Sequence, residues 1–356
     1  MTTSVQLKPL KIGNVEIGFP IVQAALSGYS DWPMRVIAKR LSAPYTICEV
    51  MLDKFLVSLK ERQRTSHFLH LSEEEYPVGG QLMGAEPAQF AEASLKLVEA
   101  GFNIIDINFG CPVKKVLGRC RGGFHLSQPE VALDIVQRTR DAVPDEIPVT
   151  VKMRRGIDDT QESEDNFFTI LDGAFDIGVC AVTVHGRTVK QRYIGPSRWD
   201  FLRQVKQHLG DRILLGSGDL FTAADCLRMI EETGVDGVTV ARGAIGNPWI
   251  FQQARALAAG KPLPDPPSLH EQREVIREHF RLAAEVYPAS RVGPNMRKFG
   301  IKYSILHPQH DEVRADFVKI RDQQQWEAVL EKWYSDDLPG LHPDGRMHKA
   351  QGSCAN

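Results

Sequence analysis

Residues 103–115 of the chain, NIIDINFGCPVKK, join a short apolar run to a polar segment that contains a cysteine. The run IIDI (104–107) has the length and the isoleucine content of a strand that is buried on both faces. Gly110 and Pro112 interrupt this pattern, so Cys111 is predicted to lie at the C-terminal tip of the strand. Most free cysteines are small buried apolar residues, and on this stretch alone that role is favoured over a chemical one.

Apolar, β-branched runs of this kind recur along the first two-thirds of the chain, and most are separated by helical patterns. Buried strands that alternate with helices indicate parallel βα units, and eight units in about 250 residues predict a (β/α)8 barrel, or TIM barrel. A doubly wound α/β sheet is the alternative, but its first turn usually contains GxGxxG, whereas residues 24–28 are AALSG. The predicted strands are Phe19–Ala25, Tyr45–Val50, Val78–Met83, Ile104–Asn108, Val149–Met153, Ala181–His185, Ile213–Gly216 and Gly237–Ala241.

Proline, glycine and capping residues mark the ends of the predicted helices. Ser197 is predicted to cap a helix that ends at Gly210. The segment GKPLPDPP (260–267) separates the barrel, residues 1–260, from a helical domain, residues 261–337, and residues 338–356 are predicted to be disordered. The other helices are predicted at 87–100, 129–143, 162–178 and 222–233 in the barrel, and at 268–286, 295–306, 311–320 and 323–333 in the helical domain.

The composition is that of an ordinary globular protein with no general affinity for nucleic acid. Apolar residues make up 42% and charged residues 25% of the chain, and the formal net charge is −2 with a pI near 6.6. RNA binding would therefore require a local basic patch. The six cysteines are scattered without CxxC pairs, which predicts a reducing compartment and no structural zinc site. No signal peptide or membrane-spanning run is recognisable, so we expect a cytoplasmic protein, and we expect it to be monomeric.

Polar and cationic side chains follow nearly every predicted strand. The active sites of parallel barrels lie at the C-terminal ends of the strands, where these side chains would meet. Each has an ordinary explanation by itself, since Lys152 can extend to solvent and His185 can be a hydrogen-bonded core residue. Their joint occurrence favours a polar ligand pocket. The residues at the strand ends are Ala25, Leu26, Ser27, Gly28, Glu49, Gln81, Asn108, Cys111, Lys152, Arg154, His185, Arg187, Ser217, Gly218, Asp219, Arg242 and Gly243.

The last two predicted strands end in the glycine-containing segments GSG (216–218) and ARGA (241–244), each followed by a helical pattern. Barrels commonly bind phosphate at these positions through backbone N–H groups and a helix N-terminus, although glycines also permit tight turns. A phosphate beside Arg242 and a cation at Lys152 suit flavin mononucleotide (FMN), whose ring edge Gln81 would contact. No cluster of histidines and carboxylates has the spacing of a metal site, so we expect no metal.

From about Pro20 to Lys332 the chain resembles the tRNA-dihydrouridine synthases, in particular those of bacterial type. The resemblance implies an FMN-bearing barrel followed by a helical domain. It also implies an enzyme that reduces the C5–C6 double bond of selected uridines in tRNA, with NADPH or NADH reducing the flavin first. The segments that carry it are GYSDWPMR (28–35), DINFGCPVKKV (106–116), VKMRRG (151–156), VHGRT (184–188), GSGD (216–219), ARGAIGNPWIF (241–251) and NMRKF (295–299).

The resemblance also implies roles for individual residues. Cys111 would be the general acid that protonates C5 of uracil, and an ordinary thiol pKa of about 8.5 keeps it protonated at neutral pH. The uracil would have to leave its stack to reach the barrel, and the RNA backbone would be held electrostatically. The implied cofactor contacts are Ala25, Leu26, Ser27, Gln81, Lys152, His185, Ser217, Gly218, Asp219, Ala241 and Arg242. The implied substrate contacts are Asn108, Arg154 and Arg187 for the base, and Lys114 and Lys115 for the RNA backbone.

Several positions depart from the family pattern. The loop GRCRGGFHL (118–126) replaces a loop rich in glycine and alanine, and AALSG (24–28) stands where a proline and a methionine are common. Ser217 and Phe299 stand where asparagine and histidine are usual. Two alternatives therefore remain: a barrel that binds tRNA with little or no catalysis, and a small-molecule FMN reductase of the dihydroorotate dehydrogenase type. The helical extension and the lysine pair 114–115 argue against the second.

Overall fold

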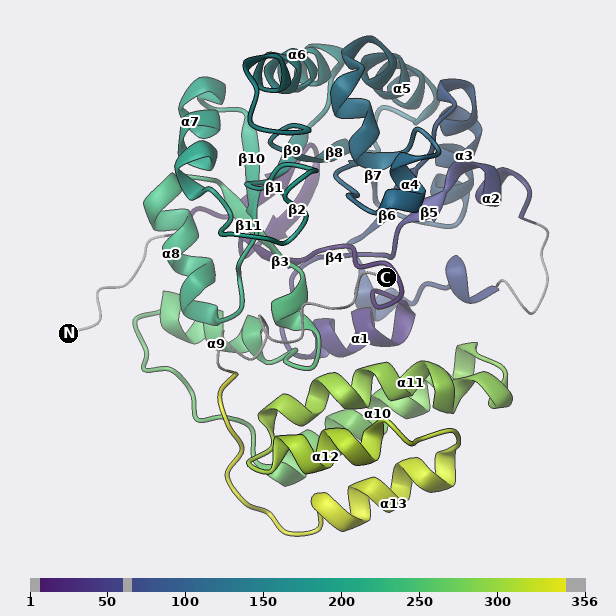
Figure 1. Cartoon of the computed structure of the whole chain (residues 1–356), viewed down its shortest axis with the longest axis vertical. Helices are drawn as coiled ribbons and strands as arrows, with labels where there is room; N and C mark the ends of the chain where they lie inside the picture. Colours follow the sequence, from purple (N-terminus) through teal and green to yellow (C-terminus); the bar gives the residue numbers. More distant parts are fainter. Residues whose placement is uncertain (1–6, 60–65, 344–356) are drawn as a thin grey trace.

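The computed structural model describes residues 7–59 and 66–343. Eight parallel strands form a closed barrel, because β4 pairs with both β3 and β6 while β11 pairs with β3 (Figure 1). The predicted (β/α)8 barrel is therefore confirmed. The barrel strands are β3 (Ile21–Gln23), β4 (Thr46–Ile47), β6 (Val78–Met83), β7 (Ile104–Phe109), β8 (Val149–Arg154), β9 (Ala181–His185), β10 (Ile213–Ser217) and β11 (Gly237–Val240).

Helices surround the barrel, and most of their predicted boundaries agree with the structure to within a residue or two (Figure 1). Among residues 7–59 and 66–343, no helix combines the length and the apolar character that a membrane crossing requires. The helices are α1 (Trp32–Arg40), α2 (Asp53–Val57), α3 (Pro87–Glu99), α4 (Lys114–Leu117), α5 (Pro129–Ala142), α6 (Gln161–Ile177), α7 (Trp199–Leu209), α8 (Ala223–Thr233) and α9 (Ile250–Ala258).

The helix ends show why the boundaries were predictable and where one prediction was wrong. Gly178 ends α6 with a φ of 109°, a left-handed conformation that glycine adopts without strain. The prediction that Ser197 caps α7 is wrong, because α7 begins at Trp199. The backbone N–H of Ser197 instead donates to Asp219 Oδ2 at 2.8 Å, so Ser197 belongs to the loop that borders the barrel opening.

A short N-terminal hairpin, which the sequence analysis did not predict, packs against the barrel interior. It consists of β1 (Leu10–Ile12) and β2 (Val15–Gly18), which pair antiparallel. The side chains of Leu10 and Ile12 are buried in one cluster with the barrel residues Val22, Tyr45 and Leu215. The opposite, C-terminal end of the barrel is left to polar side chains.

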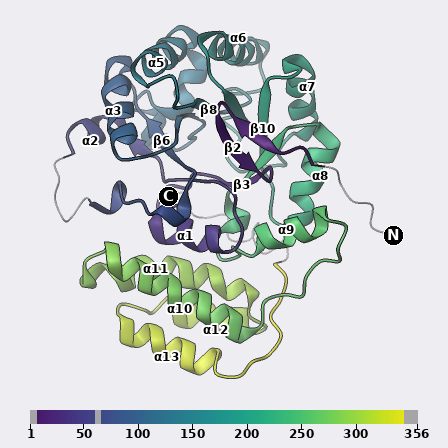
Figure 2. The same ribbon diagram turned by 180° about the vertical axis from the view of Figure 1, so that it is seen from behind.

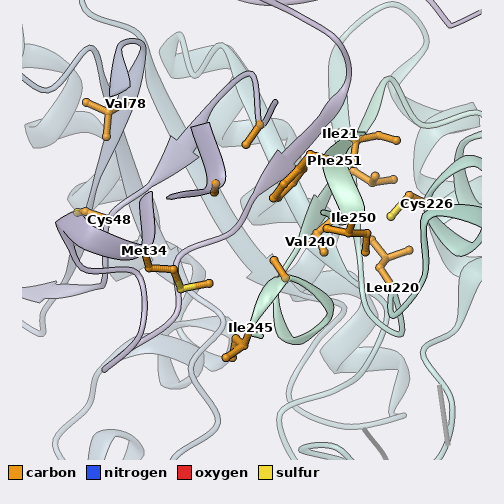
Figure 3. Close-up of a cluster of buried hydrophobic side chains, with 14 of the residues drawn as sticks. Ile21, Met34, Cys48, Val78, Leu220, Cys226, Val240, Ile245, Ile250 and Phe251 are labelled. Atoms are coloured by element: carbon orange, nitrogen blue, oxygen red, sulfur yellow. The ribbon is translucent and has the colours of Figure 1, made fainter. Parts of the chain in front are cut away.

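The main apolar core lies between the barrel strands and the surrounding helices. Figure 3 shows Ile250 and Phe251 of α9 close to Ile21 of β3 and Val240 of β11, all of them fully buried. Outward-facing residues of the strands therefore anchor the helices. The alternate residues face into the barrel and are available for a site.

Four further helices follow the barrel and form a bundle that lies beside α1 and α9 (Figure 1). Helix α11 starts six residues before its predicted start at 295, and Pro294 lies inside the helix. Here Gly293 packs so closely against the backbone of Arg321 that no side chain would fit. The helices are α10 (Leu269–Val286), α11 (Ala289–Tyr303), α12 (His310–Phe317) and α13 (Gln323–Trp333).

The segment after this bundle is partly ordered, so the prediction of disorder from residue 338 is wrong for residues 338–343. Leu338 O accepts a hydrogen bond from Leu269 N at 2.9 Å, and Leu341 N donates to Leu306 O at 2.8 Å. Backbone hydrogen bonds of this kind do not depend on an apolar pattern, which is why periodicity missed them. Residues 344–356 lie outside the described part of the chain.

Candidate active site

A cavity of about 310 Å³ opens at the C-terminal end of the barrel. It has the size of a small-molecule site, and most of the strand-end residues singled out from the sequence line it. The structure thus brings together Cys111, Asn108, Arg154 and all the predicted cofactor contacts, namely Ala25, Leu26, Ser27, Gln81, Lys152, His185, Ser217, Gly218, Asp219, Ala241 and Arg242.

A chain of hydrogen bonds among β6, β7 and β8 forms one side of the cavity floor. Asp106 accepts hydrogen bonds from Thr150 Oγ1 and Gln81 Nε2, both at 2.6 Å, and Asn108 Nδ2 donates to Gln81 Oε1 at 2.7 Å. Asn108 Oδ1 in turn accepts from Gly110 N at 2.9 Å. These bonds fix the two amide groups that face the cavity, so they can present their remaining donors to a ligand without reorganising.

Lys152, on β8, places a cation in the cavity wall. Within the described residues its side chain makes no hydrogen bond or salt bridge, although the Asp106 carboxylate attracts it electrostatically. Burial and the nearby Arg154 lower the pKa of Lys152 to about 8. At neutral pH the ammonium group is charged and is available to a ligand that carries or develops negative charge.

Cys111 lies half-buried at the cavity wall, directly after β7. Its carbonyl accepts a hydrogen bond from Gly123 N at 3.1 Å, and a Cβ on Gly122 would come within 2.8 Å of Cys111 Cβ. Burial raises the pKa of the Cys111 thiol above its ordinary value, against the weaker effect of the Val113 N–H and two nearby cations. The sulfur is therefore held as a thiol, which suits a proton donor rather than a nucleophile.

Cations and aromatic rings form the opposite wall. The guanidinium group of Arg242 lies 4.8 Å from the centre of the Tyr193 ring and 5.0 Å from that of Phe221, and Arg154 lies 5.5 Å from the Tyr193 ring. Burial, and to a smaller extent the positive charge of Arg154, hold the pKa of His185 well below its ordinary value, so this imidazole is neutral. It therefore acts as a hydrogen-bonding group and not as an acid.

The segments after β10 and β11 present backbone donors to the cavity. The N–H groups of the cavity-lining residues Gly218 and Arg242 make no hydrogen bond within the part of the chain that the structure describes. By contrast, the N-terminus of α8, which was expected to help bind a phosphate, is already occupied by the carboxylate of Asp225. This carboxylate accepts from Thr222 N at 3.0 Å and from Phe221 N at 3.3 Å. The capping box thus satisfies the N–H groups of Phe221, Thr222 and Asp225 internally, while a phosphate site at this helix end stays a prediction.

Three of the predicted substrate contacts do not line the cavity. Arg187 is only 3% exposed and donates to both carboxylate oxygens of Asp219, at 2.7 and 2.8 Å, and to Gly195 O. Its donors therefore hold the loops around the cavity, and its contact with a base stays a prediction. Lys114 and Lys115 lie exposed on α4, outside the cavity opening.

Among the cavity-lining residues that the sequence analysis did not single out, four have polar side-chain groups: Tyr29, Tyr193, Thr239 and Lys302. Thr239 lies inside β11, one residue before the strand ends at Val240. Its buried Oγ1 has no hydrogen-bond partner in the described residues. Tyr193 lies in the long loop after β9. The only sequence signal for it was that it is an aromatic residue in a mostly polar loop. Among the described residues, no group of His, Cys, Asp or Glu side chains is arranged to hold a metal ion.

Comparison with known proteins identifies the family. The model of the family described as dihydrouridine synthase (Dus) matches residues 22–337. A protein described as a probable tRNA-dihydrouridine synthase from Rickettsia prowazekii (strain Madrid E) is 35% identical over 326 residues, which cover 91% of this chain and 97% of that protein. The tRNA-dihydrouridine synthase B of Xanthomonas axonopodis pv. citri (strain 306) is 32% identical over 337 residues, covering 94% and 98%.

Solved structures show the same fold at much lower sequence identity. Histamine dehydrogenase from Rhizobium sp. 4-9 has a TM-score of 0.55 at 12% identity, over 76% of this chain and 50% of that chain. The 6-hydroxypseudooxynicotine amine oxidase from Pseudomonas geniculata N1 has a TM-score of 0.54 at 14% identity, over 76% and 52%. The family itself is established by the match over most of the sequence: the chain belongs to the dihydrouridine synthase (Dus) family.

Proposed function

We propose that the chain reduces the C5–C6 double bond of specific uridines in tRNA, using FMN bound in the barrel cavity and NADPH to reduce the FMN. One observation carries the proposal: a half-buried thiol, together with an ammonium group and backbone donors that have no hydrogen-bond partner among residues 7–59 and 66–343, faces one cavity of about 310 Å³. Family membership gives the reaction, and these groups supply the chemistry that the reaction needs.

The donors in the cavity fit FMN. The N–H groups of Gly218 and Arg242, which have no partner among the described residues, would bind its phosphate together with the guanidinium of Arg242. Lys152 would lie at the edge of the ring that becomes negative on reduction, and Gln81 would contact the ring edge. When bound, the reduced flavin supplies the hydride for C6 of uracil.

The thiol of Cys111 would deliver the proton to C5 of uracil. Burial keeps its pKa raised, so the proton is present at neutral pH. Asn108 and Arg154 line the same cavity and would position the flipped base. Arg187 would act indirectly, since its two hydrogen bonds fix Asp219 at the cavity edge.

The tRNA would approach the cavity from the C-terminal end of the barrel. On and after α4, the cations Lys114, Lys115 and Arg119 are exposed and make no ion pair within residues 7–59 and 66–343. Many cations on the other faces are paired, such as Arg138 with Asp134 at 2.8 Å. A group of unpaired cations next to the cavity supplies the local basic patch that RNA binding requires despite the net charge of −2.

Dihydrouridine mapping tests this proposal. Purified protein is supplied with FMN, NADPH and tRNA that lacks dihydrouridine, and the products are analysed by mass spectrometry at single-nucleotide resolution. We expect dihydrouridine at one or a few positions, and its loss at those positions in cells without the gene. If no position changes in either experiment, the proposal is wrong.

Two simpler measurements separate the alternatives. A barrel that binds tRNA without catalysis would be purified without the visible absorption band of a flavin and would not take up added FMN. A small-molecule reductase would bind FMN but would not be retained on bulk tRNA at low salt. Retention at low salt that is lost at high salt, together with a flavin band, is expected from the proposed function.

Replacing Lys152 by methionine is expected to weaken FMN binding roughly 10- to 100-fold, because a hydrogen bond from a charged group contributes about 1.5–3 kcal/mol. Riboflavin should lose affinity by the same factor, since it has the same ring and no phosphate. Titration of flavin fluorescence near pH 7, below the pKa of about 8, measures both affinities while the wild-type ammonium is charged. Unchanged affinity for both ligands would show that Lys152 does not contact the ring.

A further inference from the structure

One of the cations that line the cavity comes from the helical bundle and not from the barrel. Lys302, in the last turn of α11, lines the cavity together with Ile245 and Arg242 of the segment after β11. Figures 1 and 2 both show α11 on the side of the bundle that faces the barrel, with α12 and α13 further away. The bundle therefore contributes a wall of the cavity.

The backbone fixes Lys302 in this place. Gly246 has a φ of +77° and packs against α11 so closely that a Cβ would clash with the Lys302 carbonyl and lie 2.8 Å from Tyr303 N. Ile245, next to it, is 4% exposed. The segment 242–246 is thus seated directly on the helix turn that carries Lys302, and only glycine permits the contact.

The charges at this end of the cavity call for a second cation. A phosphate monoester carries a charge of about −1.5 to −2 at pH 7. Arg242 is the nearest barrel cation, but its guanidinium lies 3.5 Å from Asp219 Oδ1, and this carboxylate neutralises part of its charge. Asp219 is also bound by Arg187, which does not line the cavity. Lys302 adds a positive charge on the same side.

We infer that the Lys302 ammonium group binds the phosphate of FMN. The helical bundle would then contact the cofactor directly, in addition to the barrel. The inference rests on the proposed function for the identity of the cofactor. It goes further by assigning a cofactor-binding residue outside the barrel.

The test compares FMN with riboflavin, which lacks the phosphate, in the Lys302→Met variant of the full chain. We expect FMN affinity to fall about 10- to 100-fold and riboflavin affinity to stay unchanged, so the ratio of the two affinities falls by the same factor. The matched control is Lys298→Met, one turn earlier on α11. The Lys298 ammonium lies over the rings of Tyr29 and Phe299 and does not line the cavity, so this variant should keep the wild-type ratio.

The outcomes separate this inference from the proposed function. If the wild type binds FMN more tightly than riboflavin and Lys302→Met keeps that preference, the inference is wrong and the function stands. Loss of tRNA affinity without loss of FMN affinity would assign Lys302 to RNA and also overturn it. If the wild type binds no flavin, the proposed function itself fails. If Lys302→Met does not fold, Lys302→Gln should show the same fall in the ratio of FMN affinity to riboflavin affinity. Lys302→Arg, which keeps the positive charge, should have most of the wild-type ratio.

Discussion

Replacing Cys111 by alanine is expected to lower the rate of dihydrouridine formation by about 10²- to 10⁴-fold, the range that general acid catalysis contributes. The variant should still bind FMN and oxidise NADPH, because Lys152 and the backbone donors after β10 and β11 are untouched. The thiol lies half-buried at the cavity wall, and its removal loses the hydrogen bond from the Val113 N–H but none of the proposed flavin contacts. Single-turnover measurement of product on flavin that is reduced beforehand isolates the protonation step.

The matched control is Cys120→Ala, which removes the other thiol of the same region. Cys120 is exposed and does not line the cavity, so product formation should stay at the wild-type rate. A larger loss in Cys120→Ala than in Cys111→Ala would transfer the acid role to Cys120. Equal rates in all three proteins would show that neither thiol donates the proton.

The pH dependence gives the same assignment a second check. An acid works only while it holds its proton, and burial raises the pKa of the Cys111 thiol above its ordinary value. With pre-reduced flavin, the wild-type rate is therefore expected to persist through neutral pH and to fall only on the alkaline side, as the pH passes the raised pKa. Loss of the Lys152 proton near pH 8 would lower the rate of both proteins, so Cys111→Ala should lack only the further fall at the raised thiol pKa. A fall in wild-type rate beginning near pH 6 would contradict a thiol acid.

The strand ends of the barrel could be predicted from sequence because two simple regularities act together. Buried parallel strands are short apolar runs, and the barrel places their C-terminal ends around one opening. Gln81, Asn108, Lys152 and His185 each follow from this rule without any knowledge of side-chain contacts. For the same reason the rule could not find Lys302, which reaches the cavity from a helix some 60 residues beyond the last strand.

Other errors arise where a residue's partner is distant in the sequence. Arg187 follows β9 like a ligand-binding residue, yet Asp219 and Gly195 use its donors. Ser197 has the residue type of a helix cap, but its N–H is bonded to Asp219. Helix α11 begins at Ala289 and not at 295, and it includes Pro294 and Gly293, which packs on the Arg321 backbone. In each case the residue type has the expected local preference, but tertiary contacts decide what the residue does.

Replacing Glu75 by glutamine is expected to lower the free energy of unfolding by about 3–5 kcal/mol, because it leaves a buried guanidinium without its counter-charge. Glu75 is 0% and Arg35 1% exposed, and Glu75 Oε2 accepts from Arg35 Nε at 2.7 Å. Arg35 also donates to Ser30 O and His70 O, so the pair joins α1 to the segments on both sides. Urea unfolding of wild type and variant measures the loss.

The neighbouring Glu74 provides the control. It pairs with Arg40 at 2.8 Å, but both side chains are 40% exposed, and exposed pairs contribute only about 0–1 kcal/mol. Glu74→Gln should therefore unfold nearly like the wild type. A loss in Glu75→Gln that does not exceed the loss in Glu74→Gln would show that the buried charge is compensated by the backbone carbonyls alone.

Glu75→Gln is also expected to affect the cavity, because Arg35 is connected to the cavity wall by hydrogen bonds. Arg35 Nη1 donates to Ser30 O at 3.1 Å, and Ser30 Oγ accepts from Leu26 N at 2.8 Å and donates to Ala24 O at 3.1 Å. Leu26 lines the cavity. Under native conditions Glu75→Gln should therefore weaken FMN and riboflavin binding alike, because it loosens a wall that touches no phosphate. Lys302→Met should change only the preference between the two ligands, so one pair of titrations distinguishes a loosened wall from a lost phosphate contact.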